Sequence, residues 1–155
     1  MPTVEQSIEI EVPVSTAYNQ WTQFEEFPKF MDGVEEVRQL DNTHLHWVAE
    51  IGGHREEWDA EITEQHPDER IAWKATGGKK NAGVVTFHPL DNQHCRVMLQ
   101  LDWDSEGVVE KLGSAIGQDD RQVKGDLKRF KELIESRGAE TGAWRGEVER
   151  GATNR

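Results

Sequence analysis

The chain has 155 residues, 31% of them charged, and a formal net charge of −12 at pH 7. A chain of this length forms one domain with a hydrophobic core of its own. An acidic field of this size repels phosphate backbones and anionic membrane surfaces, which argues against nucleic-acid binding and favours a soluble protein.

The compartment is indicated by what the sequence lacks. A single cysteine, Cys95, excludes an intrachain disulfide and fits a reducing cytosol. The first residues, MPTVEQSIEIEVP, have neither the basic nor the apolar region of a signal peptide. No apolar run approaches the roughly 18 residues that span a bilayer. We therefore expect a cytoplasmic protein without stable membrane insertion.

The first elements are one strand and two short helices. Residues 3–12, TVEQSIEIEV, alternate between apolar and polar side chains, which predicts a half-buried strand that ends at Pro13. Ser15 suits the N-cap of a helix over about 16–25. Pro28 suits the first turn of a second, shorter helix.

Six further segments have the period of two that is typical of strands facing a core on one side. Turn residues such as DNT, GG and HPDE separate them. This pattern predicts an antiparallel meander with one polar face. The segments are 34–40, 44–51, 55–65, 70–76, 82–90 and 95–103.

A long helix is predicted over about 105–136. Its apolar stripe contains Val109, Leu112, Ile116, Val123, Leu127, Phe130 and Ile134. At 1.5 Å per residue this helix is roughly 45 Å long, enough to cross a whole sheet. Residues 139–155 have little periodicity and are predicted to form a flexible C-terminal tail, with Trp144 as the side chain suited to dock back. The domain is expected to span 1–138.

These elements predict an α+β fold in which a seven-stranded curved antiparallel sheet wraps around the long C-terminal helix. The two short helices between the first and second strands then lie at one end of the space between sheet and helix. This segment is dense in aromatics and is expected to plug or gate the open end. The residues concerned are Trp21, Phe24, Phe27, Phe30 and Met31.

The order of elements is similar to the helix-grip fold of the START/Bet v 1-like (SRPBCC) superfamily. Several strings resemble its bacterial polyketide cyclase/dehydrase-like proteins, over about residues 3–138. The strings are VPVSTAYNQWTQFEEFPKFMDGVEEVR, WDAEITEQHPDERIAW, VTFHPLDNQHCRVMLQLDW and DLKRFKELIESRG. The resemblance is specific for the fold and weak for function, because the superfamily includes lipid, polyketide and quinone binders, aromatase/cyclases and a ribosome-association protein. It carries no shared catalytic motif.

The inward positions of the predicted strands are apolar, without an ionisable side chain among them. Cyclisation and dehydration need positioned acids or bases, so such a wall favours binding over turnover. The inward tryptophans either fill the groove or line a cavity of roughly a few hundred Å³, where their indole N–H groups would orient a ligand. The predicted cavity residues are Trp21, Phe24, Phe27, Phe30, Met31, Trp47, Trp58, Trp73, Leu99, Leu101, Val109, Leu112 and Ile116.

Three other groups could carry chemistry. Asp120 falls inside the apolar stripe of the long helix, where a carboxylate would have a raised pKa, unless Gly117 breaks the phase of the helix and turns it to water. His44 and His46 could share a metal, but they lie on the outward face without an evident third ligand. Cys95 fits a small buried residue better than a nucleophile. We expect no metal and no cofactor.

Three functions follow. The first is non-enzymatic binding or carriage of a small hydrophobic molecule: a lipid, a polyketide-like aromatic or an isoprenoid. The second is an aromatase/cyclase- or dehydratase-type enzyme, in which Asp120→Asn would abolish turnover but not binding. The third is a protein-interaction module with a vestigial cavity, which predicts a closed core and a partner recovered by pull-down. A large exposed apolar patch around Phe27 and Phe30 would point to this function.

Overall fold

The computed structural model describes residues 3–31, 33–51, 54–78, 81–103, 116–149 and 152–154. Seven of its strands form an antiparallel sheet in the order β1-β7-β6-β5-β4-β3-β2. Their bounds are β1 (Thr3–Ile10), β2 (Val34–Gln39), β3 (His44–Ile51), β4 (His54–His66), β5 (Arg70–Gly78), β6 (Asn81–Asp91) and β7 (His94–Trp103). The six strands predicted after the short helices are present within a few residues of their expected bounds.

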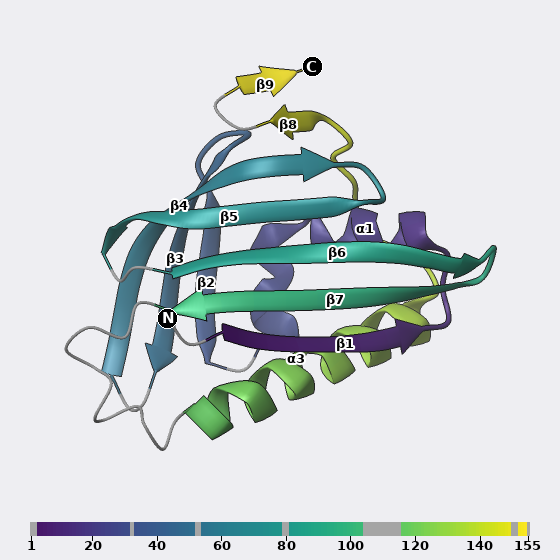
Figure 1. Cartoon of the computed structure of the whole chain (residues 1–155), viewed down its shortest axis with the longest axis horizontal. Coiled ribbons are helices and arrows are strands. Elements are labelled where there is room, and N and C mark those ends of the chain that lie inside the picture. Colours follow the sequence, from purple (N-terminus) through teal and green to yellow (C-terminus); the bar gives the residue numbers. More distant parts are fainter. Residues whose placement is uncertain are drawn as a thin grey trace.

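The sheet is strongly curved because β4 bends. Its pairing with β5 shifts register between Asp59 and Ala60 and again between Ile62 and Glu64. Bulges of this kind bend a strand and increase its twist. In Figure 1, β4 leads from the steep strands β2 and β3 to the flatter strands β5, β6, β7 and β1. The curvature gives the sheet a concave face, toward which its apolar side chains point.

The helices lie on one side of this sheet. Helix α1 (Val14–Trp21) packs across β6 and β7, the 3₁₀ helix η1 (Phe24–Lys29) lies against β2, and α3 (Ile116–Arg137) runs along β1 (Figure 1). Side chains of α3 are described from Val123 onward, and its stripe of Val123, Leu127, Phe130 and Ile134 is buried. This architecture is the helix-grip α+β fold that the sequence predicted.

Local details differ from the predictions at the helix ends. The N-cap of α1 is Pro13, not Ser15, and no side chain caps it. Pro28 lies near the end of η1 rather than in its first turn. The predicted helix from 105 is described from Ile116, and residues 104–115 lie outside the described ranges. Gly138 ends α3 with φ +75°, and its N–H donates to the Ile134 carbonyl at 2.8 Å.

Two short strands that the periodicity did not predict follow α3. β8 (Glu147–Glu149) pairs antiparallel with β4 at Gln65 and with β9 (Ala152–Asn154). Trp144 packs against the core, half-buried, and its backbone N–H donates to Thr22 Oγ1 at 3.1 Å. The C-terminal segment therefore returns to α1 in this structure, while its flexibility and the domain boundary at 138 stay predictions.

Candidate ligand-binding interior

The aromatic segment from Trp21 to Phe30 packs into the core. Trp21 meets Phe27, Phe30 and Phe130 with ring centroids 5.0–5.7 Å apart, and Phe30 lies 5.0 Å from Phe130. All but the tilted Trp21–Phe30 contact are edge-to-face, the arrangement that aromatic quadrupoles favour. These side chains are buried, as are Phe24 and Met31. They close this end of the interior.

Two tryptophans of the sheet continue this cluster. Trp47 on β3 lies directly opposite Trp58 on β4, and their rings stack with centroids 5.8 Å apart and planes at 9°. Phe27 contacts Trp47 with a centroid distance of 5.5 Å. The packing is therefore continuous from η1 to the concave face of the sheet.

Trp73 occupies space that a glycine leaves free. Trp73 on β5 pairs with Gly83 on β6, which pairs with Leu101 on β7. A Cβ on Gly83 would lie 2.5 Å from Cζ2 of Trp73 and 2.9 Å from Cδ2 of Leu101. The indole therefore lies over the bare backbone of β6, and only glycine allows this approach.

Exposure is not uniform along the concave face. Near α1, side chains such as Val85, Val97 and Phe130 are fully closed to solvent. Toward the other end, Trp47 and Trp58 are each 6% exposed, Trp73 is 8% exposed, and the neighbouring Ala75 and Leu101 are only half-buried. Met31 of the aromatic segment is also 8% exposed, so the tryptophans alone do not distinguish the two ends. The half-buried Ala75 and Leu101 make the Trp58–Trp73 end a partly exposed part of the described concave face, which we call its accessible end.

Of the remaining predicted site residues, only Leu99 has a side chain that the structure describes. Leu99 is buried on the concave face beside Val85. Ile116 and Asp120 belong to α3, but their side chains are not among those described. Val109 and Leu112 lie outside the described ranges. Their predicted role in lining the interior stays a prediction.

Three buried indole nitrogens lack a hydrogen-bond partner in the described part of the chain: Nε1 of Trp21, Trp47 and Trp58. Gln65, fully buried near the end of β4, likewise has neither side-chain amide atom paired there. A buried polar group without a partner costs about 1–3 kcal/mol. The interior thus contains polar groups that the described side chains leave unsatisfied.

Ionisable side chains near the interior were missed by the sequence reasoning. Asp126 on α3 is buried and pairs with Arg129, whose Nε donates to the Phe30 carbonyl at 2.9 Å. The i, i+3 spacing of an Asp and an Arg could have indicated this pair. Glu56, two residues before Trp58, shares its face by strand alternation and is half-buried at the accessible end.

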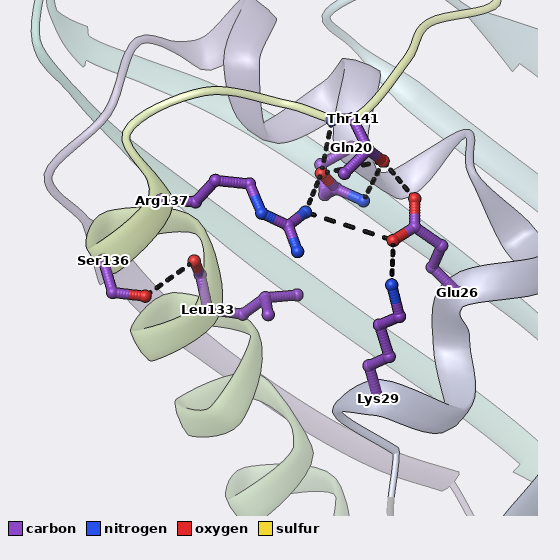
Figure 2. A network of polar contacts seen from close by, with 7 residues as sticks. All are labelled: Gln20, Glu26, Lys29, Leu133, Ser136, Arg137 and Thr141. Carbon is purple, nitrogen blue, oxygen red and sulfur yellow. Dashed lines mark hydrogen bonds and ion pairs between the residues drawn. The ribbon is translucent and has the colours of Figure 1, made fainter.

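A polar network holds the short helices to the end of α3 (Figure 2). The Arg137 guanidinium donates to Gln20 Oε1 at 3.3 Å and lies 4.0 Å from Glu26, which also pairs with Lys29 at 2.8 Å. Thr141 bonds both Gln20 and Glu26. Burial by itself would raise the pKa of Glu26, but the hydrogen bonds from Lys29 and Thr141 outweigh it and hold that pKa below its usual value.

The C-terminal segment adds a second attachment through Arg145. Its guanidinium lies 2.8 Å from Asp68 and 2.6 Å from Asn19 Oδ1, and it stands 5.5 Å from the ring centre of Tyr18. A cation over an aromatic face is favourable when both are partly desolvated. Segments from both ends of the chain are thereby joined beside α1.

The two histidines weighed as metal ligands point to separate carboxylates. His46 lies between Asp59 at 2.8 Å and Glu57 at 3.0 Å, whereas His44 lies 2.9 Å from Asp41. The hydrogen bond to Asp59, and then that to Glu57, raise the pKa of His46. No group of three metal-ligating side chains is found among the described residues.

Cys95 is fully buried on β7. Burial raises the pKa of its thiol to about 11, which leaves almost no thiolate at neutral pH. The side chain therefore has the environment of a core residue rather than of a nucleophile.

A curved sheet wrapped around a C-terminal helix defines a helix-grip fold, and comparisons with known proteins agree. The polyketide cyclase / dehydrase and lipid transport family matches residues 10–132, and the chain belongs to this family. An uncharacterised 17.2 kDa protein of Streptomyces lincolnensis is 59% identical over 149 residues, which are 96% of this chain and 99% of that protein.

Solved structures show the same fold. A protein of Deinococcus radiodurans is similar with a TM-score of 0.69 and 26% identity, over 88% of this chain and 98% of that one. The Zhui aromatase/cyclase of a Streptomyces species is similar with a TM-score of 0.73 but only 14% identity, over 92% of this chain and 98% of that one. None of the described helices is both long and apolar enough to cross a membrane.

Proposed function

We propose that the protein binds or carries a small hydrophobic molecule, of the lipid, polyketide-like aromatic or isoprenoid class. The site is the interior between the concave face and the first half of α3. One observation carries the proposal. The apolar concave face is closed near α1 but keeps partial exposure at Ala75 and Leu101, where a ligand would enter.

Family membership supports this proposal, because the family description includes lipid transport. Under this proposal the aromatic segment is the closed end of the site and the tryptophans of β3, β4 and β5 are its wall. Val109, Leu112 and Ile116 would complete the wall from the side of α3.

Among the described side chains, the state of the ionisable groups near the interior favours binding over turnover; the side chain of Asp120 is not one of them. A general acid or base must be free to exchange a proton with the substrate. Asp126 is paired with Arg129, and Glu56 lies at the half-buried rim rather than in the interior. The interaction-module alternative predicts a closed core, and an exposed apolar patch at Phe27 and Phe30 would have pointed to it. That patch is absent, because both side chains are buried.

We further propose a cytoplasmic setting without a nucleic-acid partner. The net charge of −12 opposes phosphate backbones, and the one cysteine is a buried free thiol. A protein partner is compatible with this proposal, but no described feature requires one.

Native mass spectrometry of gently purified protein, followed by denaturing extraction, tests the proposal. We expect a stoichiometric hydrophobic molecule that is lost on denaturation. Two matched variants locate it, because Ala75→Leu adds a side chain to the partly exposed interior and Lys74→Leu adds the same one to the opposite face. Occupancy should fall in Ala75→Leu only. A protein that is empty and takes up no lipid, quinone or aromatic from a panel would refute the proposal.

A further inference from the structure

Two hydrogen-bond donors stand side by side on the concave face. Trp47 and Trp58 are directly opposite each other in the β3–β4 ladder and stack with their planes at 9°. Opposite residues of neighbouring strands share one face of a sheet. Both indoles therefore lie on the wall of the proposed site, next to its accessible end.

The pair lacks acceptors. Nε1 of Trp47 and Nε1 of Trp58 are both buried, and neither has a hydrogen-bond partner in the described part of the chain. An indole nitrogen donates one hydrogen bond and accepts none. Only a group with an accepting lone pair can satisfy these atoms, so the missing partner is an oxygen or nitrogen acceptor.

The charge of the surroundings selects a neutral acceptor. By strand alternation, the concave face of β3 to β7 carries no lysine or arginine among the described residues. Its rim holds Glu56, and the buried Asp126 is already paired. A carboxylate or phosphate would enter beside the Glu56 carboxylate and without a counter-charge from these described strands, which is strongly unfavourable in a desolvated site.

We propose that Trp47 and Trp58 are the polar recognition element of this site, and that its ligand is a neutral ketone or quinone whose oxygen accepts a hydrogen bond from an indole N–H. The inference rests on the proposed function and deepens it. Both nitrogens are closed to solvent in this structure, so the ligand reaches them by displacing neighbouring side chains from the Trp58–Trp73 end.

A matched pair of probes tests the inference. Fluorenone and fluorene have nearly the same shape, but only fluorenone has a carbonyl oxygen. We expect calorimetric titration of the whole protein to show roughly five- to tenfold tighter binding of fluorenone, the size of a typical net hydrogen bond. In the double variant, and in at least one of Trp47→Phe and Trp58→Phe, fluorenone affinity should fall to that of fluorene, while fluorene still binds. Trp144→Phe, outside the proposed site, should keep the preference.

The outcomes separate the two proposals. Equal binding of both probes to the wild type, or a preference that survives in the double variant, would overturn the inference and leave the proposed function standing. Tighter binding of fluorene-9-carboxylate than of fluorenone would also overturn it. If neither neutral probe binds the wild type, the inference fails, whereas the proposed function fails only if the protein is also empty and takes up nothing from the panel of lipids, quinones and aromatics. Retained fluorene binding by the variants shows that their interior has folded.

Discussion

Whether the aromatic segment is core or gate can be decided at Phe27. The side chain is 1% exposed and its ring contacts Trp21, Phe24, Phe30 and Trp47, with centroids 5.4–5.5 Å away. Among the described residues, it is the ring that joins the aromatic segment to the tryptophans of the sheet. Its truncation would leave a cavity at the centre of this cluster.

The expected loss of stability for Phe27→Ala is about 3–5 kcal/mol, the range for truncating a buried phenylalanine. The upper half of this range is more apt, because four ring contacts, each worth about 0.5–1.5 kcal/mol beyond burial, are lost together. Phe27→Leu keeps most of the volume and should cost about 1–2 kcal/mol. Leu90→Ala, at a side chain that is 48% exposed, should change stability by less than about 0.5 kcal/mol.

Urea unfolding followed by far-UV circular dichroism measures these differences. A whole domain is stable by only about 5–15 kcal/mol, so Phe27→Leu remains measurable if Phe27→Ala does not fold. A loss below about 1 kcal/mol for Phe27→Ala would refute the packing argument. It would mean that the ring spends much of its time outside the cluster, as a gate does.

Three other predictions follow from single contacts. Gly83→Ala should cost about 1–3 kcal/mol in urea unfolding, because the new Cβ forces the Trp73 indole away; unchanged stability would mean that the indole does not lie over β6. The raised pKa of His46, held chiefly by Asp59, stabilises the fold below pH 6.5 and ceases to do so as the pH rises through the folded pKa. The stability difference between wild type and His46→Gln should therefore shrink from pH 5.5 to pH values well above 6.5, and a constant difference would contradict the assignment. Cys95, with a thiol pKa of about 11, should resist dithiobis(nitrobenzoate) at neutral pH until the protein unfolds; rapid labelling would show that β7 opens locally.

Most of the burial pattern of the strands could be predicted from the sequence because it follows a period of two. Leu45, Trp47, Trp58 and Trp73 face the core as the alternation indicates. The same alternation places Glu56 on the inner face, which the prediction overlooked by starting that strand's inward positions at Trp58. The burial of Gln65 could not be predicted from the alternation, because the register shift between Ile62 and Glu64 turns an outward position inward.

Contacts between distant segments required the tertiary structure. No local pattern predicts the contact of the Arg129 side chain with the Phe30 carbonyl, or of Arg145 with Asp68. These contacts depend on how the helices and strands are positioned relative to one another. The prediction that Trp21–Phe30 plugs or gates one end of the interior rested only on the order of the elements along the chain. The packing of this segment against Phe130, and the exposure of the opposite end instead, are properties of the assembled layers.

The sequence by itself determined the class of fold, the inward face of the regular strand segments and the apolar character of the interior, because hydrophobic periodicity and turn residues act locally. Only the tertiary structure decided which end of the interior is accessible, how Trp73 rests on Gly83, and that the indole nitrogens of Trp47 and Trp58 are buried without partners among the described residues. These features depend on side-chain packing between strands and helices, and such packing has no signature in any single stretch of the chain.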